Sequence, residues 1–200
     1  MDHRRDDVVE LARYLPDIAI AAALAWGSGL RAYAVIFAVG LAGALGWIPL
    51  PEHLQLLQHP LVLGASGFMT AVEFFADKVP WLDSLWDTIH SFIRIPAGAA
   101  LAAAVFGDSG AAVALAAAIL GGTLAAGVHL AKAGTRAAMN ASPEPFSNWT
   151  ASLAEDAMVP AGLWLAVAHP IVFFFALAIF VVSMILLLRF IWRGLRRLFA

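Results

Sequence analysis

Residues 157–188 read AMVPAGLWLAVAHPIVFFFALAIFVVSMILLL, a run of 32 residues that contains no Asp, Glu, Lys or Arg. A membrane-spanning helix needs about 20 mostly apolar residues to cross a hydrocarbon core about 30 Å thick. The run is too long for one untilted helix, and His169-Pro170 divides it, because proline lacks the N–H that a continuing helix would use. We therefore predict parts of two adjacent membrane spans.

The composition of the whole chain points the same way. Its 200 residues are 62% hydrophobic and 13% charged, with a mean hydropathy of +0.84, whereas a soluble domain is about 45–50% apolar and 25% charged. A net charge of −2 and a pI near 6.3 give no basic surface for nucleic acid. The absence of cysteine excludes disulfides, thiol catalysis and Cys-ligated zinc. We predict an all-α integral membrane protein.

Hydropathy and the positions of Pro and Gly divide the chain into about six predicted transmembrane helices. They cover residues 17–47, 60–77, 83–106, 111–136, 148–168 and 170–190. Residues 1–200 then form one polytopic membrane domain, with a charged N-terminal segment at 1–16 and a basic tail at 191–200. The first span contains Gly27-Ser28-Gly29, and we expect it to bend or split there.

The distribution of Lys and Arg predicts the orientation, because cytoplasmic loops carry an excess of both. Six spans with the N-terminus inside place the loops 48–59, 107–110 and 168–170 outside, and none of these contains Lys or Arg. Every Lys and Arg except Arg31 then lies at or near the inner side. We expect a multi-pass protein of the inner membrane, embedded in the lipid bilayer, with both termini cytoplasmic.

Acidic side chains inside the predicted spans are the first candidates for function, because intramembrane ionisable groups are costly. The second span carries Glu73 and Asp77, four residues apart on one helical face, and the fifth carries Glu155-Asp156. We predict that these four acids bind substrate or protons. Their predicted counter-charges are Arg31, Arg94 and Arg136.

The third and fourth spans carry complementary charges at helical spacing, which places each set on one face. The third presents Asp83, Asp87, His90 and Arg94, and the fourth presents His129, Lys132 and Arg136. The short turn at 107–110 makes the two spans antiparallel neighbours, and the depths of the charges match. We expect helix pairing by Asp83 or Asp87 with Lys132 or Arg136. The candidate metal ligands are His90 and His129, with a structural role as the alternative.

A sequence similarity between the two halves of the chain raises the hypothesis of an internal repeat. Ser28-Gly-Leu-Arg31-Ala resembles Ala133-Gly-Thr-Arg136-Ala. Three predicted spans precede the turn at 107–110 and three follow it, so the second half would insert upside down relative to the first. The chain would then consist of two inverted three-helix halves.

Several strings of residues carry a family resemblance. They are Trp26-Gly-Ser-Gly-Leu-Arg-Ala-Tyr33, Glu73-Phe-Phe-Ala-Asp-Lys-Val-Pro80, Asp83-Ser-Leu-Trp-Asp-Thr-Ile-His90, Phe92-Ile-Arg-Ile-Pro-Ala-Gly98 and Ser142-Pro-Glu-Pro-Phe-Ser-Asn-Trp149. Together they resemble the bacterial membrane family called domain of unknown function 4126, over about residues 17–190. The resemblance implies a multi-pass membrane protein and brings no activity with it. Glu73-x-x-x-Asp77-Lys78 is also similar to the Glu-x-Gly-Asp-Lys motif of a cation-exchanger family, although its spacing is one residue longer and the glycine is absent.

These observations favour a small membrane transporter of a cation or small solute, coupled to protons through the intramembrane acids. The alternative is a non-transporting scaffold or partner subunit whose charges pair helices. A further alternative is an intramembrane metal-dependent enzyme, for which the chain offers no nucleophile motif, Gly-rich phosphate loop or HExxH. The sequence leaves the substrate, any cofactor and homo-oligomerisation open.

Overall fold

The computed structural model describes residues 3–140 and 146–198, and these form helices without any strand. The helices are α1 (His3–Ala44), η1 (Glu52–Gln58), α2 (Pro60–Ala76), α3 (Pro80–Val105), η2 (Gly107–Ser109), α4 (Ala111–Asn140), α5 (Phe146–Ala168) and α6 (Pro170–Leu198). The all-α prediction is therefore confirmed. Helices α2 to α5 begin and end within a few residues of the predicted spans, whereas α6 extends through most of the predicted basic tail.

Five of these helices contain a segment long and apolar enough to cross a membrane. The segments are Arg13–Ala44, Leu82–Val105, Ala111–Asn140, Phe146–Ala168 and Pro170–Gly194. The apolar helix α2 has only 17 residues, which corresponds to a length of roughly 25 Å. These helices indicate a multi-pass α-helical membrane protein, and a membrane span formed by α2 remains a prediction.

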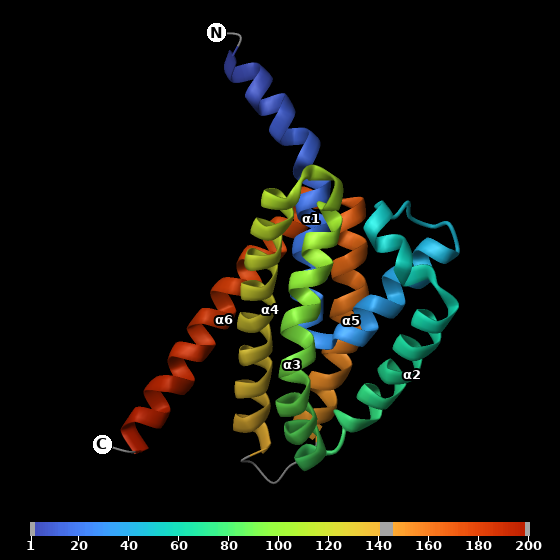
Figure 1. The fold of residues 1–200 in the computed structure, drawn as a ribbon. Helices are drawn as coiled ribbons and strands as arrows, with labels where there is room; N and C mark the ends of the chain where they lie inside the picture. The colour runs from blue at the N-terminus through green and yellow to red at the C-terminus, as the bar shows by residue number, and fades with distance from the viewer. Residues whose placement is uncertain (1–2, 141–145, 199–200) are drawn as a thin grey trace.

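Helix α1 does not cross the bundle as one rod, because its backbone breaks at Arg31, where φ is −148° and ψ is 83°. In Figure 1 the first part of α1 descends into the bundle and the second part turns back toward the end from which it came. Contacts at that end agree with this path. Tyr14 lines the same cavity as Asp108 of η2, and His53 of η1 lies 3.2 Å from Asp108.

The return of α1 corrects the predicted topology. A first span crossing over residues 17–47 would place the start of α1 opposite the loop at 48–59. In the structure both lie at the same end as η2, and the end of α6 lies at the other end (Figure 1). The start of α1 and the end of α6 therefore lie at opposite ends of the molecule, whereas the prediction placed both on one side of the membrane. Hydropathy could not predict the return of α1, because a helix that crosses the membrane and one that enters and returns can have the same length of apolar sequence.

Small residues allow α1, α3 and α4 to pack closely. A Cβ on Gly29 of α1 would lie 2.6 Å from the carbonyl oxygen of Ala125 in α4. A Cβ on Gly121 of α4 would lie 2.5 Å from the Cβ of Ala102 in α3. Both distances are shorter than a normal contact, so these backbones approach only because the positions are glycine.

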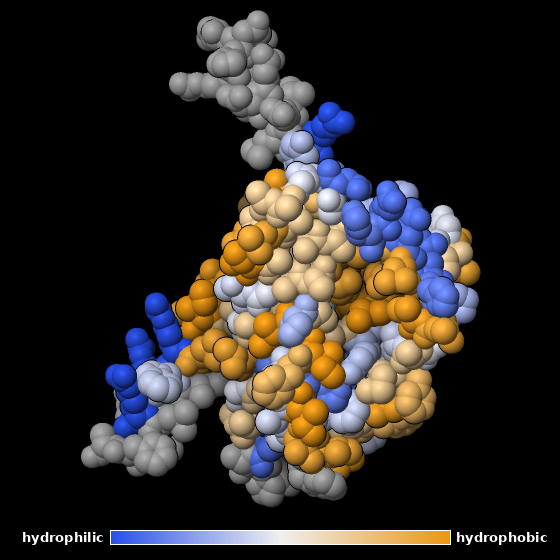
Figure 2. Space-filling model, in the orientation of Figure 1, coloured by the Kyte–Doolittle hydropathy of each residue, from blue (hydrophilic) through white to orange (hydrophobic). Residues whose placement is uncertain are grey.

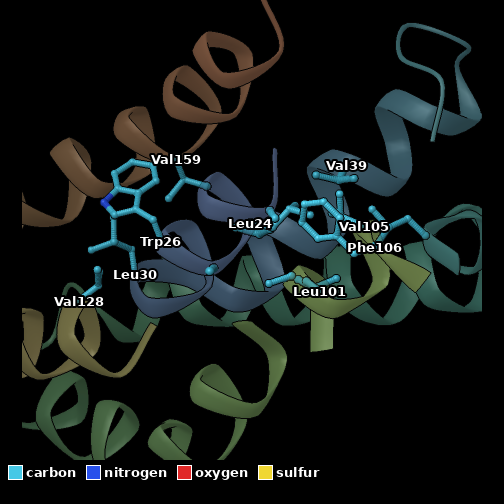
Figure 3. Packing of buried hydrophobic residues seen from close by; sticks show 14 residues of the cluster. Leu24, Trp26, Leu30, Val39, Leu101, Val105, Phe106, Val128 and Val159 are labelled. Atoms are coloured by element: carbon cyan, nitrogen blue, oxygen red, sulfur yellow. The ribbon is translucent and has the colours of Figure 1, made fainter. Parts of the chain in front are cut away.

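The apolar core surrounds both parts of α1 (Figure 3). Trp26, just before the break, lies with Val128 of α4 and Val159 of α5. Val39, in the returning part, lies near Phe106 at the end of α3. The broken helix is thus held on both sides of the break by packing with the rest of the bundle.

On the face seen in Figure 2, apolar side chains cover most of the middle of the molecule. Hydrophilic side chains gather around η1 and along the far part of α6 in this view. Large apolar side chains such as Phe68, Ile119 and Phe175 are exposed to the surroundings of the molecule. Charged side chains are instead buried inside the bundle. An apolar outside with charges inside is the arrangement that a lipid solvent favours.

Candidate functional site

The structure gathers charged side chains from α1 to α5 and from the turn after α2 into one cluster, which we call the ion network. Its six acids and five bases are Glu73, Asp77, Asp83, Asp87, Glu155, Asp156, Arg31, Lys78, Arg94, Lys132 and Arg136. Most of them are almost completely buried. The network lies between the break in α1 and the end of the bundle where α2 joins α3.

Arg31 connects the break in α1 to two other elements. Its Nη2 lies 2.9 Å from Oδ2 of Asp77, in the turn after α2, and its Nε lies 3.1 Å from Oδ1 of Asp156 in α5. Its Nη2 also donates to the hydroxyl of Ser152 at 3.0 Å. The carbonyl of Leu30, beside the break, accepts from Nζ of Lys132 at 3.3 Å. Non-helical backbone at membrane depth needs such partners inside the protein.

Lys132 of α4 is shared by three carboxylates. Its Nζ lies 3.0 Å from Asp77 Oδ2, 3.1 Å from Glu155 Oε2 and 3.5 Å from Asp87 Oδ1. The contact with Asp87 agrees with the predicted pairing of the third and fourth spans. The contacts with Asp77 and Glu155 were not predicted, because they depend on how α5 and the turn after α2 pack.

Arg94 connects α3 to α2 and α4. One guanidinium nitrogen lies 2.5 Å from Oε1 of Glu73, and the other contacts Asp87 and lies 3.3 Å from Nδ1 of His129. The other ring nitrogen of His129 lies 2.6 Å from the hydroxyl of Ser91. The side chain of Arg94 is only 1% exposed, so these partners replace the water that a charged group would otherwise keep.

Arg136, near the end of α4, joins the ion network through contacts with α5. Its Nη2 lies 3.0 Å from Oε1 of Glu155. Its Nη1 donates to the carbonyl and to the side-chain oxygen of Asn148 at 3.0 and 3.2 Å. Each of the three predicted counter-charges thus has at least one carboxylate partner. The four predicted acids also belong to this single network, although their role in binding substrate or protons stays a prediction.

Asp83 differs from the other acids. It is 0% exposed, and neither of its carboxylate oxygens has a hydrogen-bond partner. Of the alternatives predicted for helix pairing, Asp87 with Lys132 is present, whereas Asp83 has no ion pair with Lys132 or Arg136 among the described residues. The physical reason is competition, because Lys132 and Arg136 already contact Asp77, Glu155 and Asn148. Helical spacing on α3 and α4 alone could not reveal those competitors.

The charges of the ion network do not balance. Six carboxylates against five basic groups leave one negative charge when all are ionised. An uncompensated charge in a buried site is costly, so a proton or a bound cation is expected to neutralise it. Asp83 is the acid in excess, because it has no ion pair and no hydrogen-bond partner among the described residues.

The family model described as Domain of unknown function (DUF4126) matches residues 18–190. The chain belongs to the DUF4126 family. This confirms the resemblance inferred from the sequence strings, and the family description assigns no activity. No curated protein and no solved structure matches the chain.

One group of carboxylates in this DUF4126 protein could hold a metal ion. Asp77, Asp83 and Asp87 each offer an oxygen, and these atoms lie within 4.8 Å of one another. The candidate ligands from the sequence, His90 and His129, are not in that group. His90 stacks on Trp86 with ring centroids 4.1 Å apart, and its Nδ1 lies 2.8 Å from the Trp86 carbonyl.

Two cavities in this DUF4126 protein lie away from the ion network. One of about 810 Å³ lies between α1, α3 and α4 near η2, and it is lined mainly by small and apolar residues such as Ala22 and Leu124. The other, of about 240 Å³, lies beside Trp26 and Phe173. Neither is lined by an acid or base of the network.

Proposed function

We propose that this protein is a small inner-membrane transporter that moves a cation or small solute, coupled to protons through its buried acids. The observation that carries the proposal is that Asp77, Glu155 and Asp156 all approach Arg31 at the break in α1. Glu73 is linked to these acids through Arg94, Asp87 and Lys132. Discontinuous helices commonly form the binding sites of transporters, because their free backbone groups and helix ends can contact an ion or substrate.

The shared contacts supply a mechanism based on competition. Arg31 and Lys132 both contact Asp77, and both also contact Glu155. A cation or proton that binds one of these acids weakens its attraction for the bases. Arg31 would then release the turn after α2 or α5, and the two parts of α1 could change their angle. A ligand that binds one arrangement better than the other shifts the population between them.

The scaffold alternative is favoured by a different feature of the same network. Every acid of the ion network except Asp83 has a basic partner within 4.0 Å among the described residues. Buried charges paired in this way can simply fix how helices pack. A scaffold would keep these pairs closed under all conditions, whereas a transporter must open some of them during its cycle.

We propose further that the end of the molecule holding Lys78, Arg136 and Arg189 faces the cytoplasm. More Lys and Arg lie at this end than at the other, where the start of α1 carries Arg4, Arg5 and Arg13 and the loops 48–59 and 107–110 contain neither Lys nor Arg. The end of α6 is then cytoplasmic. The start of α1 lies on the opposite side, which replaces the expectation that both termini are cytoplasmic.

Two inverted halves also remain a proposal, and one contact supports them. The arginines of the two similar strings, Arg31 and Arg136, both approach Glu155, at 3.8 and 3.0 Å. Their backbones differ, because Arg31 lies at the break in α1 whereas Arg136 lies within the continuous helix α4. The inverted arrangement further requires three crossings before the turn at 107–110, and α2 and α3 supply only two of them if α1 returns at Arg31.

The test of transport is reconstitution of the purified protein into liposomes that enclose a pH-sensitive dye. An imposed gradient of the transported cation or solute should drive proton movement, and Glu73→Gln should abolish it while thermal unfolding shows an intact fold. Glu52→Gln is the matched control, because Glu52 is exposed at the opposite end. Absence of flux for every cation and solute tested, from protein shown to be folded, would replace the transporter by the scaffold.

A further inference from the structure

Asp83 and its two acidic neighbours leave several buried oxygens without partners. Both carboxylate oxygens of Asp83 lack a hydrogen bond, as do Oδ1 of Asp77 and Oδ2 of Asp87. All three residues are at most 2% exposed. One oxygen from each lies within 4.8 Å of the others. The unpartnered oxygen atoms and the close grouping are separate observations, and both point to a positively charged ligand.

The basic side chains of the ion network do not supply partners for these carboxylate oxygens. Lys132 and Arg31 contact Oδ2 of Asp77, and Lys132 and Arg94 contact Oδ1 of Asp87. The opposite oxygens of these two carboxylates remain free. Asp83 lies in the first turn of α3, where the helix dipole favours a negative charge. The dipole lowers the cost of that charge but provides no hydrogen bond to either oxygen, and a buried unpaired carboxylate remains costly.

We propose that Asp77, Asp83 and Asp87 bind one sodium ion. Carboxylate oxygens are ligands for hard cations such as Na⁺, Mg²⁺ and Ca²⁺. One monovalent ion would bring the charge of the ion network from −1 to zero. A divalent ion would leave a buried charge of +1 close to Lys132, whose Nζ lies 3.0 Å from Asp77.

The spacing of the three carboxylate oxygens also distinguishes between possible cations. Ca²⁺ binds oxygens at about 2.3–2.6 Å, so ligands on opposite sides of it stand roughly 5 Å apart. Oxygens within 4.8 Å of one another fit an ion of this size, and Na⁺ is close to Ca²⁺ in radius. Mg²⁺ requires oxygens at about 2.0–2.1 Å and usually keeps several waters, which a fully buried group disfavours. Size and charge together therefore select Na⁺.

This assignment extends the proposed function by naming the cation. It rests on that function for the ion's role in transport, but not for its binding. Binding and flux can be measured separately. Saturable Na⁺ binding without flux in liposomes would refute the transporter and leave the site intact. Flux that does not depend on Na⁺ or on Asp83 would refute the role of this site in transport and leave transport itself intact.

The test measures thermal unfolding of the purified protein in detergent at constant ionic strength, with NaCl replaced by KCl or choline chloride. Na⁺ should raise the Tm saturably, by roughly 5–10 °C at about 100 times its Kd, and K⁺ and choline should not. Asp83→Asn should abolish this response without lowering the Tm in choline, because it removes an unpaired buried charge. Asp108→Asn, at an exposed position at the other end of the molecule, should keep the full response.

Calorimetric titration of the wild-type protein with NaCl gives a second, independent measurement. It should show about one Na⁺ per chain, which keeps the proposal testable even if Asp83→Asn fails to fold. The proposal is overturned by the absence of Na⁺ binding in this titration, or by a Na⁺ response that survives in folded Asp83→Asn. Stabilisation by Ca²⁺ but not by Na⁺ would equally overturn the assignment of a sodium ion.

Discussion

Nη2 of Arg31 and Oδ2 of Asp77 lie 2.9 Å apart at the break in α1, and the two side chains are 1% and 0% exposed. This ion pair joins the break in the first helix to the turn between α2 and α3. A charge that would be costly in lipid is thereby used to hold a non-helical stretch of backbone inside the bundle.

Replacing Arg31 should therefore destabilise the whole fold. Arg31→Met leaves Asp77 and Asp156 without one of their basic partners, and removing one partner of a buried pair costs about 3–5 kcal/mol. Denaturant unfolding in mixed micelles measures the loss. Arg13→Met is the matched control, because Arg13 is exposed on the same helix, and it should change the free energy of unfolding by less than about 1 kcal/mol. Equal effects of the two substitutions would mean that the Arg31 pair does not support the break.

The return of α1 predicts which positions share a side of the membrane. The chain contains no cysteine, so single cysteines can be introduced at Tyr14, Glu52, Asp108 and Arg193. The first three should react with a membrane-impermeant thiol reagent from one side, and Arg193→Cys from the other. If position 14 reacts together with position 193 instead, residues 17–47 cross the membrane and the hairpin at Arg31 is wrong.

The contact between Asp87 and Lys132 predicts coupled effects on stability. Asp87→Asn and Lys132→Met should each lower the free energy of unfolding by about 3–5 kcal/mol, because each leaves a buried charge with fewer partners. The double variant should recover part of the summed loss, since both charges are then gone. His53→Gln and Asp108→Asn provide a control cycle at an exposed pair, where the coupling should be about 0–1 kcal/mol. Strictly additive losses at Asp87 and Lys132 would show that the two residues do not interact.

Close packing of α1 on α4 predicts opposite effects at two glycines. Gly29→Ala brings a Cβ within 2.6 Å of the Ala125 carbonyl oxygen, so it should cost about 1–3 kcal/mol through overpacking. Gly64→Ala, within α2 and with open space around the new methyl group, should gain about 0.5–1 kcal/mol from helix propensity. Thermal unfolding of the two variants measures the difference. A neutral Gly29→Ala would indicate that α1 and α4 lie farther apart than in the structure.

Much of the helical framework follows from local sequence. The proline at the start of α2, α3 and α6 and the turn at 107–110 fix where these helices begin, because proline is tolerated in the first helical turn but not in the interior. Helical spacing also placed Asp83, Asp87 and Arg94 together on α3, and Lys132 and Arg136 on α4. These features depend on residues within one helix, so periodicity is sufficient to find them.

The path of the chain and the pairing of its charges were decided by tertiary structure. Apolar length predicted a membrane segment at residues 17–47, but only packing against α3, α4 and α5 decided that α1 breaks at Arg31 and returns. The residues of α3 and α4 predicted partners for Asp83, but α5 and the turn after α2 bring competing groups to Lys132 and Arg136. A buried charge pairs according to every group within about 4 Å of it, and that neighbourhood is drawn from helices distant in sequence. The sequence therefore determined which charges enter the membrane, and the tertiary structure determined which one remains unpaired.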